Sequence, residues 1–123
     1  MTYRKVRRWG KVQLDPTNDF TRRVFTQGEC GMLARALNHL VGAPIVLTNG
    51  HAAVIAPNGK ILDIEGVHSV KKFEKRWGRI DDVVDPNDTS FNHFNECASI
   101  KWVDAIPYAK KVIDVYGPTC GLE

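Results

Sequence analysis

The chain has 123 residues, of which 43% are hydrophobic and 25% are charged, and its formal net charge is +3. This length suits one domain over residues 1–123, and the composition excludes a disordered chain. No stretch approaches the roughly 20 apolar residues of a membrane span, and no apolar run follows the basic start as in a secretory signal, so a soluble protein is expected.

Basic residues are concentrated at the start of the chain. Residues 1–23, here called the basic arm, hold seven Lys or Arg against two Asp. The favoured interpretation is one or two short, solvated strands around Gly10, whose charges prevent pairing with other chains. Contact with nucleic acid is the less favoured alternative, because the basic residues form no recognised nucleic-acid motif; those residues are Arg4, Lys5, Arg7, Arg8 and Lys11.

The predicted elements begin over residues 15–25 with a turn that leads into a short element of unassigned type. Residues 30–41 then predict a helix, because apolar side chains recur there at spacings of three and four, and Gly42 is a natural stop. Two short strands rich in β-branched residues follow over 44–48 and 51–56. A hairpin turn at Pro57-Asn58-Gly59 leads into a return strand over 60–66.

The second half of the chain predicts two more helices. Ser69 is placed to cap a helix that ends at Gly78, and a last helix runs from about Tyr108 to Gly117. Between them, residues 81–95 predict a loop with a short helical turn. The fold class that follows is α+β, with a cysteine-bearing helix packed on a small antiparallel sheet.

Cys30 is the candidate nucleophile, because it stands where a turn enters the first turn of a helix. Backbone N–H groups and the helix dipole favour negative charge there, so we expect the thiol to ionise easily. The alternative is a small buried hydrophobe, the usual fate of a free cysteine. Gly28 and Gly31 favour the nucleophile, since they let a substrate backbone approach closely.

A thiolate nucleophile needs a base and an orienting acceptor, and the hairpin supplies His51 and Asp63. A three-residue loop pairs Ala53 with Asp63 and places His51 and Asp63 on one face, turned toward Cys30, whereas a two-residue loop separates them. The longer loop is favoured, because Gly59 suits its left-handed position. The same register sets Glu65 opposite His51, which makes Glu65 a rival orienter. His39 and His68 have no comparable partner and are interpreted as structural.

The strings GECGMLARAL and HAAVIAPNGKILDIEG resemble the compact bacterial and phage forms of the papain-like cysteine hydrolase superfamily. That group includes peptidases, protein deamidases and transglutaminase-like acyl transferases. The resemblance covers residues 26–78 and implies a papain-like minimal core with Cys30 as nucleophile, His51 as general base and acid, and Asp63 as orienter. Gln27 is the candidate for the oxyanion site, although it lies three residues before the cysteine rather than six.

Cys30, Cys97 and Cys120 are an odd number of cysteines, which favours free thiols in a reducing, cytoplasmic compartment of the protein's own cell or of a host. His93 and Cys97 are four residues apart, but no second ligand pair stands nearby, so no metal or other cofactor is expected.

Two functions remain open. The first is a thiol-dependent hydrolase or acyl transferase acting on an amide or isopeptide bond of a peptide or protein substrate. The alternative is a non-catalytic binding or inhibitor protein of phage or effector type on the same scaffold. It would contact a partner protein or nucleic acid through the basic arm and through an acidic loop, whose carboxylates are Asp81, Asp82, Asp85 and Asp88.

Overall fold

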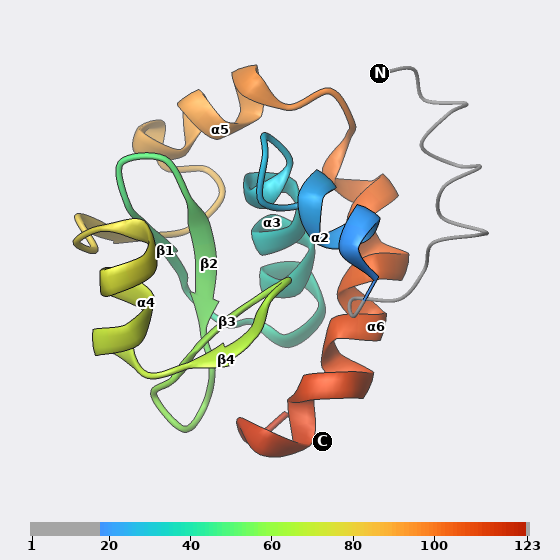
Figure 1. Ribbon diagram of the computed structural model, residues 1–123. Helices are drawn as coiled ribbons and strands as arrows, with labels where there is room; N and C mark the ends of the chain where they lie inside the picture. Colours follow the sequence, from blue (N-terminus) through green and yellow to red (C-terminus); the bar gives the residue numbers. More distant parts are fainter. Residues whose placement is uncertain (1–17, 123) are drawn as a thin grey trace.

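A five-stranded antiparallel sheet has one helix on one side and several helices on the other (Figure 1). The structure is a computed structural model that describes residues 18–122, so the predicted strands around Gly10 and the basic side chains before residue 18 lie outside the described residues. The strand order is β4-β3-β2-β1-β5, and every neighbouring pair is antiparallel. The strands are β1 (Ile45–Leu47), β2 (Ala52–Ile55), β3 (Ile61–Asp63), β4 (Gly66–His68) and β5 (Asp82–Val84).

The helices confirm an α+β fold. In chain order they are α2 (Asp19–Val24), α3 (Cys30–Val41), α4 (Val70–Trp77), α5 (Asn92–Cys97) and α6 (Ile106–Tyr116), with short 3₁₀ segments η1 (Thr89–Phe91), η2 (Trp102–Ala105) and η3 (Gly117–Thr119). Within residues 18–122, none of these helices has the length and apolar character needed to cross a membrane.

The two helices predicted around the hairpin are confirmed. Helix α3 ends at Gly42, whose φ of 71° is left-handed and whose N–H donates to Asn38 O. Helix α4 begins after Ser69, whose hydroxyl accepts a hydrogen bond from Lys72 N at 3.2 Å. Because the caps are encoded by single residues, both helix boundaries could be read from the sequence.

The hairpin has the predicted three-residue loop. Val54 pairs with Leu62 and Ile55 with Ile61, a register that sets Ala53 opposite Asp63. Gly59 has a φ of 85° and its N–H donates to Ala56 O at 2.9 Å, as the left-handed loop position requires.

The prediction for residues 81–95 is wrong in part. Strand β5 forms within this segment and pairs with β1, where Ile45 lies opposite Val84, and α5 adds a helix rather than a single turn. Strand β4 also forms where no strand was expected. Strands of three residues are too short to show an alternating pattern, and they form here because a neighbouring strand supplies their hydrogen bonds. Helix α6 begins at Ile106, two residues early, with Pro107 in its first turn.

The two faces of the sheet bury different clusters. Helices α3 and α6 cover the larger one, to which the sheet contributes Ala52, Val54 and Leu62. On the opposite face Ala53 and Ile61 pack against Phe73 of α4, with Trp77 beside them. Figure 1 shows α4 on one side of the sheet and α3 with α6 on the other.

Candidate functional site

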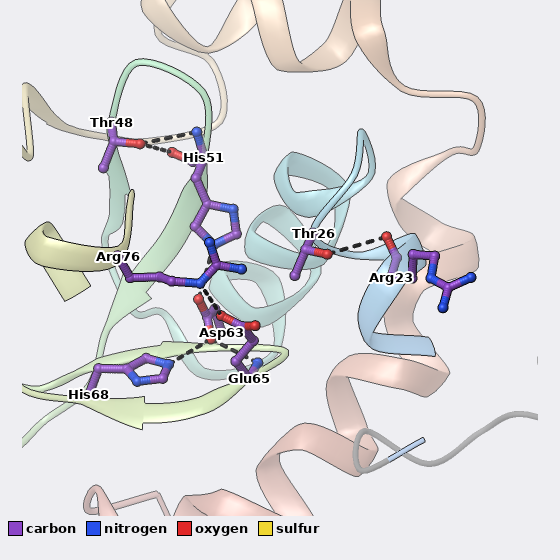
Figure 2. A network of polar contacts seen from close by, with 8 residues as sticks. All are labelled: Arg23, Thr26, Thr48, His51, Asp63, Glu65, His68 and Arg76. Atoms are coloured by element: carbon purple, nitrogen blue, oxygen red, sulfur yellow. Dashed lines mark hydrogen bonds and ion pairs between the residues drawn. The ribbon is translucent and has the colours of Figure 1, made fainter. Parts of the chain in front are cut away.

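His51 and Asp63 form a buried pair on the α4 face of the sheet. The two side chains meet through His51 Nε2 and Asp63 Oδ2 at 2.9 Å, and their exposed fractions are 0% and 3% (Figure 2). His51 stands directly before β2, in a turn closed by Thr48, whose hydroxyl accepts from His51 N at 3.1 Å. The predicted couple across the hairpin is therefore present.

The structure pairs His51 with Asp63 rather than with the rival Glu65. The ladder between β2 and β3 stops before it reaches Glu65, which belongs to the turn between β3 and β4. The Glu65 carboxylate contacts Arg76 Nε at 3.5 Å instead. Asp63 Oδ1 accepts a hydrogen bond from Glu65 N at 2.8 Å, so the Asp63 carboxylate also closes this turn.

Asp63 is ionised in the folded protein. Burial alone would raise its pKa, but hydrogen bonds from His51 and His68, together with the charges of both imidazoles, lower the pKa from 3.8 to about 2. An ionised carboxylate only accepts hydrogen bonds, so His51 Nε2 carries a hydrogen and donates it. In neutral His51 the basic lone pair is consequently on Nδ1.

Nδ1 of His51 has no hydrogen-bond partner among the described residues, although it is buried. In the view of Figure 2 it lies on the side of the ring toward α3. The Trp77 ring stacks on the imidazole, with centroids 3.8 Å apart and planes within 13°. Trp77 therefore covers the face of the imidazole that is turned to α4. The Nδ1 lone pair lies in the plane of the ring and is not directed at Trp77.

Cys30 is the first residue of α3, as predicted, and it is only 4% exposed. It packs in the cluster beneath α3, whereas the ring of His51 contacts Phe73 and Trp77 of α4, so the two side chains lie on different faces of the sheet. The expectation that His51 and Asp63 turn toward Cys30 is corrected in this respect. The thiol nevertheless interacts with the backbone amide of Ala52, the neighbour of His51. No hydrogen bond joins the Cys30 thiol to His51 Nδ1, which is unpartnered.

The acidity of Cys30 differs from the prediction. Burial raises the pKa of its thiol above the ordinary value, and the negative charge of Glu29 adds to this. Interactions with the backbone N–H groups of Ala52, Gly31 and Cys30 itself favour the thiolate and oppose the effect of burial. The helix position therefore acts in the expected direction, but desolvation outweighs it.

The two glycines beside Cys30 have different surroundings. Gly28 has a φ of 116° and nothing within 4 Å of the position where a Cβ would lie, so the turn before Cys30 is open. A Cβ on Gly31 would stand 2.6 Å from Phe94 Cβ, so the space at Gly31 is filled by α5. The expected close approach of a substrate backbone is possible at Gly28 and excluded at Gly31.

Gln27 is exposed in the turn between α2 and α3. Its backbone N–H donates to Arg23 O at 3.1 Å, and within the described residues its side chain makes no hydrogen bond with Cys30 or His51. The neighbouring Glu29 is buried, and its carboxylate accepts from Ser99 N at 2.9 Å and Ile100 N at 3.3 Å. These bonds tie the start of α3 to the segment after α5.

Sequence reasoning missed the part that His68 takes in the site. His68 Nε2 lies 3.0 Å from Asp63 Oδ1, so the histidine interpreted as purely structural contacts the candidate orienter. The signal is a register: His68 pairs with Ile61, two residues before Asp63 and therefore on the same face. Reading it requires β4, which the sequence did not predict.

The remaining candidates lie apart from this site. His93 and Cys97 are exposed on α5 with Sγ 3.7 Å from Nε2, and residues 18–122 contain no group of three or more His, Cys, Asp or Glu that could hold a metal ion. The four carboxylates of the acidic loop, Asp81, Asp82, Asp85 and Asp88, are all exposed.

Comparison of the chain with known protein families, with curated proteins and with solved structures returned no match.

Proposed function

We propose that this protein is a thiol-dependent hydrolase or acyl transferase of papain-like type, acting on an amide or isopeptide bond of a peptide or protein. Cys30 is the nucleophile, His51 the general base and acid, and Asp63 the orienter. The observation that carries the proposal is His51: its Nε2 is bound to an ionised Asp63, and its basic Nδ1 is buried without a partner. A buried ring nitrogen left unpaired costs free energy, and a catalytic role is one reason for a protein to keep such a group.

The proposed reaction begins when His51 Nδ1 takes the proton of the Cys30 thiol. The thiolate attacks the carbonyl carbon, and the C–N bond breaks as His51 returns the proton to the leaving amine. Water, or an acceptor amine in a transferase, then attacks the thioester and gives its proton to His51, which passes it to the departing sulfur. Cys30 packs on the α3 side of the sheet, the His51 ring contacts α4, and the thiol and Nδ1 are not hydrogen-bonded. The first transfer therefore requires a conformation other than the described one, in which the two groups come together.

The experiment uses p-nitrophenyl acetate, an activated ester that acetylates a nucleophilic thiol and releases p-nitrophenol. We expect a burst of nitrophenol and an acetylated Cys30 in peptide mass spectra, both lost in Cys30→Ser. In His51→Gln the burst slows by roughly 10²–10⁴-fold, the usual contribution of a general base. His39→Gln is the matched control, because His39 is exposed on the same helix as Cys30. Equal rates in the wild type and Cys30→Ser would contradict the proposal.

The burial of Cys30 favours a second candidate, a binding protein that does not use the thiol. At 4% exposure and with a raised pKa, the thiol has the properties of a small hydrophobe packed under α3. The exposed carboxylates of the acidic loop then provide a surface for a basic partner. This candidate predicts that Cys30→Ser leaves partner binding unchanged, whereas reversing the charges of Asp85 and Asp88 abolishes it.

A further inference from the structure

Asp63 joins two histidines rather than one. His51 Nε2 lies 2.9 Å from Oδ2 and His68 Nε2 lies 3.0 Å from Oδ1, and Figure 2 shows the carboxylate between the two rings. The histidines come from opposite sides of β3, His51 from the start of β2 and His68 from the end of β4. The three side chains thus form a continuous His–Asp–His row across three adjacent strands.

The sheet register fixes this row. Val54 pairs with Leu62, which sets His51 and Asp63 diagonally on one side of β3, and Ile61 pairs with His68, which sets His68 diagonally on the other side. Phe73 of α4 lies against both imidazoles, with ring centroids 5.8 Å from His51 and 6.4 Å from His68. The row is therefore held by backbone pairing beneath it and by α4 above it.

The charges in this row do not balance when both histidines are protonated. One carboxylate can neutralise one imidazolium, and Asp63 serves both rings. The other charged groups that face the row are Glu65, from the turn after β3, and Arg76 of α4, which pairs with that Glu65. Cys30 packs on the opposite face of the sheet and adds no positive charge. A proton on one histidine therefore opposes a proton on the other.

We propose that His68 is a positioning residue that acts through Asp63 on His51. It holds Oδ1 so that Oδ2 stays directed at His51, and its own proton makes His51 a poorer acceptor for the thiol proton. The hydrogen bond with Asp63 raises the pKa of His68, so His68 keeps its proton over a wider pH range than a free imidazole. The effect on catalysis rests on the proposed function, whereas the coupling between the two histidines does not.

The test is a pH titration of the full chain, followed by NMR of the imidazole nitrogens. In the wild type we expect the His51 signals to shift in two steps, one of them at the midpoint of His68. In His68→Gln, whose amide still donates to Oδ1 but cannot titrate, the His51 midpoint rises relative to the wild type, because the positive charge of the neighbouring imidazole is absent. His93→Gln is the control, because His93 is exposed on α5, and it leaves the midpoint unchanged.

A single-step titration of His51 in the wild type, or the same His51 midpoint in His68→Gln, would overturn the inference. The wild-type curve decides the question even where a variant does not fold. The ester assay is a separate readout: His68→Gln moves the acid limb of the burst rate to a different pH, whereas His68→Ala, which removes the hydrogen bond, also lowers the maximal rate. An inactive wild type with coupled histidines would reject the proposed function and keep the inference.

Discussion

The substitution Asp63→Asn removes the charge of the buried carboxylate and keeps a side chain of nearly the same shape. The pKa of Asp63 falls from 3.8 to about 2 in the folded protein, and a pKa unit corresponds to ~1.4 kcal/mol. Since the folded-state pKa is the lower one, this stabilisation of roughly 2 kcal/mol is present above pH 4 and is lost as the pH falls toward 2. Asn cannot be ionised, so the variant lacks this contribution at neutral pH and has nothing to lose in acid.

The assay is urea unfolding of the wild type and Asp63→Asn at pH 5 and at pH 3. We expect the difference in unfolding free energy between them to narrow by roughly 1 kcal/mol over that interval, because the Asp63 carboxylate is protonated in the unfolded wild type and still ionised in the folded protein. Asp114→Asn is the matched control, because Asp114 is exposed on α6, and its difference from the wild type stays small at both pH values. A difference for Asp63→Asn that is equal at pH 5 and pH 3 would refute the reasoning.

Two further substitutions test the packing around the site. Gly31→Ala places a Cβ 2.6 Å from Phe94 Cβ and should destabilise the protein by roughly 1–3 kcal/mol in thermal unfolding. Gly50→Ala is the control, because nothing lies within 4 Å of its Cβ position. Equal melting temperatures of the two variants would contradict the contact with Phe94. Trp77→Ala removes the ring that stacks on His51, so diethylpyrocarbonate should modify His51 in the variant and not in the wild type; protection in both would mean that other groups close the ring.

The hairpin could be predicted from the sequence because its loop chemistry is local. Gly59 allows one loop geometry, the loop fixes the register, and the register brings His51 and Asp63 together. Which face of the sheet this pair occupies relative to Cys30 depends on where α3 and α4 pack, and that is a tertiary property. The same limit explains the pKa of Cys30: its place at the helix start is visible in the sequence, whereas the burial that outweighs it is not.

His68 illustrates a different limit. Its contact with Asp63 requires β4, whose three residues form a strand only because β3 lies beside them. A histidine that precedes a capped helix carries no local sign of that pairing. Spacing and periodicity therefore could not predict a second imidazole beside Asp63, although the strand register places it there.

The Asp63 carboxylate has both a structural role and a role in the proposed chemistry. Variants of Asp63 therefore cannot test the function by themselves. Its carboxylate closes the turn before β4 and holds both histidines, so replacing it perturbs the fold whether or not the protein is an enzyme. His51 is more informative, because a purely structural histidine would gain by pairing Nδ1 as well as Nε2, and an unpaired buried group costs about 1–3 kcal/mol. If that nitrogen takes the Cys30 proton, His51→Gln should slow acylation by the roughly 10²–10⁴-fold expected for loss of a general base, while the fold persists. A scaffold that only binds should tolerate the same change in its binding and show no acylation to lose.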